Sequence, residues 1–186
     1  YTLSLHDALP ILGIRDSLRE VPWFFRAIAY RVGEYSLTPE DIEHGILRGN
    51  RRSPGSLRRP FGAGDPRREL SVGRPDPRIH FALVCGSRSC PPIEAFAPDE
   101  LEEQLETAAK VFINATTRLD RSAGTVRLSR IFKWYRRDFP GQDADLVRSV
   151  ARRLYDPEAG EWLEARAERV RLRYGAYDWR LNQTRE

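Results

Sequence analysis

The sequence predicts an α+β fold, because helix-type and strand-type segments intermix without a regular strand–helix–strand alternation. Apolar residues recur at helical spacing over residues 98–114, 144–155 and 159–168. Continuous or alternating apolar runs, which are typical of strands, occupy residues 79–85, 125–128 and 170–174. We therefore expect a small buried β-sheet packed by several helices.

Composition limits the class of protein. The chain has 186 residues, of which 40% are hydrophobic and 31% are charged, as in a globular domain with a sizeable core. No apolar run approaches the roughly 18 residues that a membrane helix needs. The net charge of +4 is a small difference between 31 basic and 27 acidic groups. Because aromatic residues are not interleaved with the densest basic run, we expect no nucleic-acid partner.

The first eleven residues, YTLSLHDALPI, raise the question of their origin. Written in ordinary codons, they resemble a translated sequencing adapter. We therefore expect residues 1–11 to be a non-native scar and residues 12–186 to form a single domain whose natural N-terminal part is missing. On this interpretation His6 and Asp7 are not site candidates.

A well-marked helix is predicted over SLTPEDIEHGILRGN. Thr38 suits the N-cap, and the buried stripe is expected to consist of Ile42, Ile46 and Leu47. His44 lies off that stripe, four residues after Glu40, so we expect it on the helix surface in an ion pair.

The following residues, 48–69, contain seven arginines together with Gly, Pro and Ser. We expect a mobile surface loop there. If this loop has a function, we expect it to be a flap that attracts anions beside a functional site.

The segment HFALVCGSRSCPP carries the residues best suited to chemistry. On the predicted strand His80 and Cys85 point to opposite faces, so they do not form a direct pair within it. Cys90 lies in the loop after Gly86 and can turn back towards either face. Polar groups at the end of a buried strand are a common way to build a site.

Four interpretations of the two cysteines stay open. The first is a disulfide between Cys85 and Cys90, and the second is a Cys90 nucleophile with Arg88 helping to hold its thiolate. In the second, His80 or His44 is the base, and Asp76 or Asp178 is the orienting group. The third is a zinc site formed by His44, His80, Cys85 and Cys90. The fourth is a pair of reduced thiols that only pack.

Two pairs of residues near the cysteines are explained more simply by a structural role than by catalysis. Ser87 and Ser89 are expected to form hydrogen bonds within the loop, because no nucleophile-elbow motif surrounds them. In YDWRLN, Asp178 is expected to cap a turn while Trp179 packs.

In order along the chain, YSLTPEDIEHGILRGN, DPRIHFALVCGSRSCPP, VRLSRIFKWYRRDF and YDWRLN resemble the domain of unknown function 547 family, over about residues 13–182. The most specific part is HFALVCGSRSCPP, and IFKWYRRDF is next. The family's upstream helix with an Asn- and Tyr-containing motif has no match here. Many bacterial members are exported, so the resemblance implies an exported or periplasmic protein.

The resemblance also suggests a papain- or transglutaminase-like layout. Such a layout would be a hydrolase or acyl-transfer site. From the residues themselves we expect His80, Cys90 and Asp178 to be catalytic and Arg88, Ser87 and His44 to take part in binding. The substrate would be a small molecule or a peptide, with no cofactor unless zinc is bound. The rival hypothesis is a non-enzymatic binding or scaffolding domain, in which a Cys85–Cys90 disulfide closes a loop and the arginine-rich flap meets an acidic partner.

Overall fold

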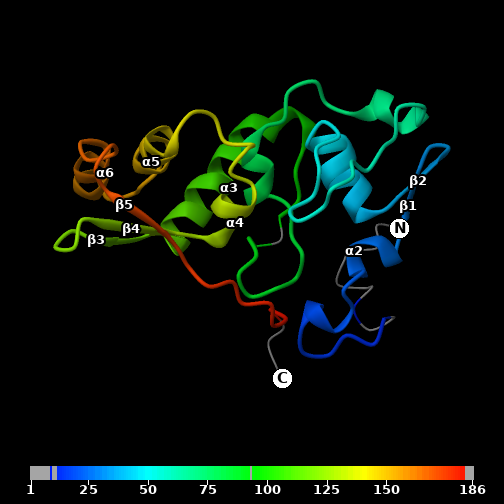
Figure 1. The fold of residues 1–186 in the computed structure, drawn as a ribbon, viewed down its shortest axis with the longest axis horizontal. Helices are drawn as coiled ribbons and strands as arrows, with labels where there is room; N and C mark the ends of the chain where they lie inside the picture. The colour runs from blue at the N-terminus through cyan, green and yellow to red at the C-terminus, as the bar shows by residue number, and fades with distance from the viewer. Residues whose placement is uncertain (1–8, 10–11, 93, 183–186) are drawn as a thin grey trace. The chain divides into compact units, whose positions relative to one another are not determined.

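The computed structural model describes residue 9 and residues 12–92 and 94–182. Helices predominate in this part of the chain, and short strands accompany them (Figure 1). The α+β class predicted from the sequence is confirmed. None of the helices in the described ranges is long and apolar enough to cross a bilayer.

The chain divides into two compact units. The first comprises Tyr1–Asp76, Leu83–Cys90 and Asp178–Glu186, and the second comprises Pro77–Ala82 and Pro91–Tyr177. Each unit has its own cluster of buried apolar side chains.

The first unit begins with short helices and a hairpin. Its elements, in which η denotes a 3-10 or π helix, are η1 (Leu18–Glu20), α2 (Phe24–Ala27), β1 (Tyr30–Val32), β2 (Tyr35–Leu37), η2 (Asp41–Leu47) and η3 (Pro66–Leu70). Strands β1 and β2 are antiparallel, and Tyr30 lies opposite Leu37. The buried apolar cluster consists of Leu9, Ile14, Leu18, Phe24 and Leu181.

Element η2 is a π-helix within the helix predicted from the sequence. Thr38 caps the helical turn at residues 39–40 that leads into η2, as expected: its hydroxyl accepts the Asp41 N–H at 3.1 Å, and the Asp41 carboxylate accepts the Thr38 N–H at 3.0 Å. At the C-terminal end, the Arg48 N–H donates to the Glu43 carbonyl, a spacing of five residues.

The buried face of η2 differs from the prediction. Its buried residues are His44 and Gly45, whereas Ile42, Ile46 and Leu47 are only partly buried. The predicted stripe and the surface position of His44 are therefore wrong. The physical reason is the wider π turn, which rotates successive side chains away from the positions that a 3.6-residue period assigns.

Two hydrogen bonds join the ends of the arginine-rich loop that follows η2. The Asn50 side chain donates to the Phe61 carbonyl at 2.9 Å and accepts the Phe61 N–H at 3.0 Å. Asn50 and Phe61 are 5% and 1% exposed. This pair closes the base of a loop, whose mobility stays a prediction.

The second unit holds a three-stranded sheet packed by helices. Its elements are η4 (Pro77–Phe81), η5 (Pro98–Glu100), α3 (Leu101–Thr116), β3 (Arg118–Asp120), β4 (Thr125–Leu128), α4 (Arg130–Trp134), α5 (Asp143–Ala151), α6 (Pro157–Glu164) and β5 (Arg171–Tyr174). The strand order is β3-β4-β5, with β3 antiparallel and β5 parallel to β4. The strand predicted at 125–128 is confirmed, and the one predicted at 170–174 begins one residue later. The three predicted helices are present with shifted ends: α5 ends at Ala151 and α6 at Glu164.

The predicted strand at residues 79–85 is wrong. Residues 77–81 form the 3-10 helix η4, and residues 83–85 have no regular structure. Phe81 is 3% exposed and packs against the rings of Phe112, Phe132 and Phe139. The apolar run therefore reflects burial of a short helical turn, which strand-type periodicity does not distinguish in so short a segment.

Candidate functional site

The two cysteines lie on a loop of the first unit that the end of the chain holds in place. Gly86 has a φ of +87°, a left-handed conformation that suits glycine. The Arg88 N–H donates to the Arg180 carbonyl at 2.8 Å, and the Asn182 N–H donates to the Gly86 carbonyl at 3.0 Å. Ser87, which is fully buried, forms an antiparallel bridge with Leu181. The loop is thus part of a small backbone ladder.

The sulfurs of this loop lie side by side. Cys85 Sγ and Cys90 Sγ are 2.9 Å apart, with no disulfide bond between them in this structure. The Cys85 N–H donates to Cys90 Sγ at 2.8 Å, while Cys85 Sγ lies 3.2 Å from Ser87 Oγ. The Cys90 sulfur thus lies within reach of a backbone donor.

Asp178 holds a turn at the end of the same unit. Its carboxylate accepts the Arg180 N–H at 3.1 Å and pairs with the Arg180 guanidinium at 2.5 Å. This hydrogen-bonded pairing, aided by the charge of Arg88, lowers the pKa of Asp178 to about 2. The Asp178 N–H also donates to Ser89 Oγ at 2.8 Å. The turn predicted for Asp178 is confirmed, and Trp179 packs against the unit's apolar cluster.

The imidazole of His80 lies in the core of the second unit. Its Nε2 is 2.8 Å from Asp138 Oδ2, and both side chains are 1% exposed. Tyr135 stacks on the imidazole with the ring centroids 3.8 Å apart and an interplanar angle of 22°. Because an ionised carboxylate only accepts hydrogen bonds, Nε2 is the donor in this contact.

Sequence reasoning missed Asp138 and Tyr135 as partners of His80. The signal that was available is their place in IFKWYRRDF, a segment that carries the family resemblance. The sequence placed His80 on a strand and considered Asp76 or Asp178 for its partner, whereas the carboxylate that contacts it in the structure follows α4.

His44 is held by a basic neighbour. Its Nδ1 lies 2.9 Å from Arg48 Nη1, and the Glu43 carboxylate lies 3.5 Å away. Arginine has no acceptor, so His44 Nδ1 is the acceptor in this contact. Arg48 also donates to the Arg52 carbonyl at 2.9 Å.

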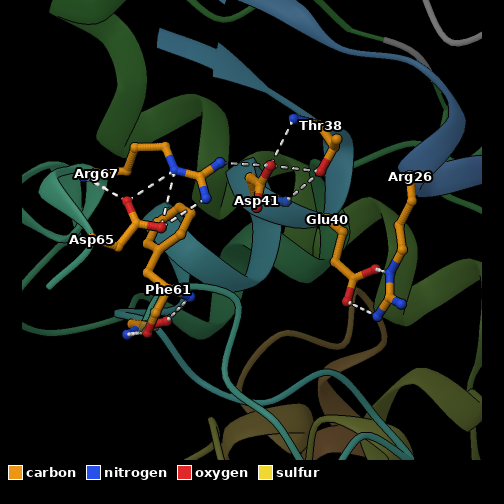
Figure 2. A network of polar contacts seen from close by, with 8 residues as sticks. Arg26, Thr38, Glu40, Asp41, Phe61, Asp65 and Arg67 are labelled. Carbon is orange, nitrogen blue, oxygen red and sulfur yellow. Dashed lines mark hydrogen bonds and ion pairs between the residues drawn. The ribbon is translucent and has the colours of Figure 1, made fainter. Parts of the chain in front are cut away.

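Figure 2 shows two groups of charged side chains around η2. Arg67 contacts the carboxylates of Asp65 at 2.7 Å and Asp41 at 3.2 Å, and its guanidinium lies over the Phe61 ring. Glu40 pairs with Arg26, whose hydrogen bonds lower the pKa of the Glu40 carboxyl. These contacts tie η2 to its neighbours in the chain.

A metal site has no ligand set in the described ranges. No three His, Cys, Asp or Glu side chains gather there as a metal ion would require. The zinc alternative, which needs His44, His80 and both cysteines together, finds no support.

Comparison with known proteins shows a match to one protein family. A family model described as "Protein of unknown function, DUF547" matches residues 2–113, which include the HFALVCGSRSCPP segment. No curated protein and no solved structure matches the chain. The match begins inside the segment predicted to derive from an adapter. Apart from Leu9, that segment lies outside the described residues, and its origin stays a prediction.

Proposed function

This chain belongs to the DUF547 family, whose function is unknown, and we propose that it is a cysteine-dependent hydrolase or acyltransferase. The proposal rests on the chain's own residues. Cys90 is the nucleophile and His80 the general base. Asp138 takes the orienting role that sequence reasoning gave to Asp178, because Asp138 is the carboxylate that contacts His80. The substrate is a small molecule or a peptide with an ester, thioester or amide group.

The observation that carries the proposal is the contact between His80 Nε2 and Asp138. A carboxylate bonded to one ring nitrogen fixes the tautomer and stabilises the imidazolium that forms when the other nitrogen takes a proton. A carboxylate–imidazole pair of this kind is what holds the general base in Ser- and Cys-dependent hydrolases. A buried ionisable pair also costs free energy unless it is satisfied or useful.

Cys90 is the better nucleophile of the two cysteines. The backbone N–H of Cys85 donates to its sulfur, which lowers the cost of forming the thiolate. The thiolate attacks the acyl carbon and expels an amine, an alcohol or a thiol, which receives the proton held by His80. Water, or an acceptor amine in acyl transfer, then attacks the thioester while His80 removes its proton, and the thiolate is restored.

The pH dependence of cysteine alkylation tests this assignment. Iodoacetamide labelling of Cys90 in reduced protein is followed by mass spectrometry from pH 5 to pH 9 in the wild type and in variants. We expect H80Q and D138N to slow Cys90 labelling at pH 6 at least tenfold, since a tenfold change corresponds to one pKa unit of the thiol.

A matched carboxylate provides the control. D178N removes an acid from the loop's own turn and is expected to leave the labelling profile of Cys90 close to wild type. If the profile of Cys90 is the same in folded H80Q as in the wild type, His80 is not its base and the proposal is wrong.

A second function is favoured by the separation of 2.9 Å between the two sulfurs. In this alternative Cys85 and Cys90 form a structural disulfide, and the protein is a non-enzymatic binding or scaffolding domain. Alkylation with and without reductant separates the two. Quantitative protection of both cysteines before reduction, in protein kept under native conditions, rules out the nucleophile and supports the disulfide.

A further inference from the structure

The positive charge of the protein is concentrated in residues 51–74, which we call the basic segment. It contains seven arginines against two acidic residues, Asp65 and Glu69, a net charge of +5. The remaining 162 residues carry 24 basic and 25 acidic groups. Positive charge that is confined to one segment indicates that an anionic partner binds there, whereas charge that serves solubility would be spread over the surface.

Two sets of contacts attach the basic segment to the rest of the first unit. Most of its arginines take no part in these contacts. The Asn50–Phe61 hydrogen bonds close the base of a loop over residues 51–60. Further on, Arg67 is bound by Asp65 and Asp41, which fastens η3 to η2 (Figure 2). Arg67 therefore serves the fold.

Five other arginines of the basic segment face solvent. Within the described residues they form no ion pair with a carboxylate, and all five are exposed: Arg52, Arg58, Arg59, Arg68 and Arg74. Some arginines of the second unit, by comparison, pair with Asp or Glu: Arg121, Arg136, Arg148, Arg152 and Arg153. The basic segment thus presents cationic groups that the protein does not neutralise itself.

Aliphatic side chains stand among these arginines. Leu57 is 85% exposed next to Arg58, and Leu70 and Val72 are 38% and 37% exposed. Seven large hydrophobic residues are exposed in the described residues, and these three lie within the 24 residues of the basic segment. Exposed apolar groups flanked by cations are typical of segments that rest on a membrane surface.

We propose that the basic segment docks on an anionic phospholipid surface, with the arginines on lipid phosphates and Leu57 inserted between headgroups. Charge complementarity favours an anionic partner, and the exposed aliphatic residues favour lipid over nucleic acid. A nucleic-acid site would offer exposed aromatic rings for base stacking, whereas the one aromatic residue of the segment, Phe61, is buried. The proposal is independent of the thiol chemistry.

Vesicle sedimentation with the 186-residue chain tests the docking. We expect binding to phosphatidylcholine vesicles containing about one-third phosphatidylglycerol, no binding to pure phosphatidylcholine, and a loss of affinity as salt rises through about 0.15 M. The double variant R52Q/R58Q is expected to lower the affinity about thirtyfold. L57S is expected to lower it about tenfold with the salt dependence retained.

The matched control is R127Q/R169Q, which removes the same charge from two exposed arginines of the second unit. It is expected to leave the affinity within about twofold of the wild type. The proposal is overturned if anionic vesicles fail to bind, or if the control lowers binding as much as R52Q/R58Q. Tighter binding to duplex DNA than to vesicles, with L57S silent, would assign the surface to nucleic acid instead.

Discussion

At the scale of single residues, the contact between His80 and Asp138 joins two side chains that are each 1% exposed. Removing the carboxylate leaves a buried imidazole without this acceptor, which is more costly than never having buried the pair. We expect D138A to lower the free energy of unfolding by about 3 kcal/mol, as measured by urea denaturation. D143A, which removes the exposed partner of Arg136, should cost less than about 1 kcal/mol. Equal losses in the two variants would mean that the His80 contact contributes little.

Asp178 gives a residue-scale prediction for pH. Its pKa falls from 3.8 to about 2 chiefly because of Arg180, so folding favours the ionised carboxylate. The stabilisation it provides is present above pH 3.8 and is lost as the pH falls towards 2. In R180Q, we expect the pKa of Asp178, measured by NMR titration, to return towards 3.8. A pKa that stays near 2 in this variant would assign the shift to the backbone N–H or to Arg88.

At the scale of elements, the π-helix η2 depends on a glycine that has no special backbone conformation. Gly45 is buried, and a Cβ built on it would meet the Phe61 ring within the contact distance. We expect G45A to lower the free energy of unfolding by about 1–3 kcal/mol through overpacking. Thermal or urea unfolding measures this loss, and the double variant G45A/F61L should recover part of it. If the single variant is as stable as the wild type, Phe61 is not packed against η2.

The same elements show which parts of the fold can be predicted from sequence. Strand β4 begins and ends at the predicted residues, because the signals for it are local. The helical run after Pro77 was read as a strand, since five to seven apolar residues fit either structure. The sequence does not predict which face of η2 is buried, because no sequence pattern indicates a π turn. The Thr38 cap ahead of η2 is predicted correctly.

At the scale of the whole molecule, the candidate site depends on contacts between distant residues. His80 and Asp138 are 58 positions apart, and Ser17 bonds to the Trp179 carbonyl across 162 positions. One sequence without its relatives identifies the residue types that suit the chemistry but not the pairs they form. It therefore identified His80 and Cys90 as candidates while assigning the orienting role to a carboxylate that the structure ties to Arg180.

Two separate apolar clusters predict that the molecule loosens in parts rather than uniformly. Leu181, 5% exposed, packs with Leu18 and Phe24 in the first unit, whereas Val126, fully buried, belongs to the cluster of the second. By hydrogen–deuterium exchange, we expect L181A to speed exchange mainly in residues 14–28 and 83–90, because its cavity weakens that cluster. V126A should act mainly on residues 101–128 and 171–174. If either variant raises exchange equally in both sets of peptides, the two clusters unfold as one cooperative core.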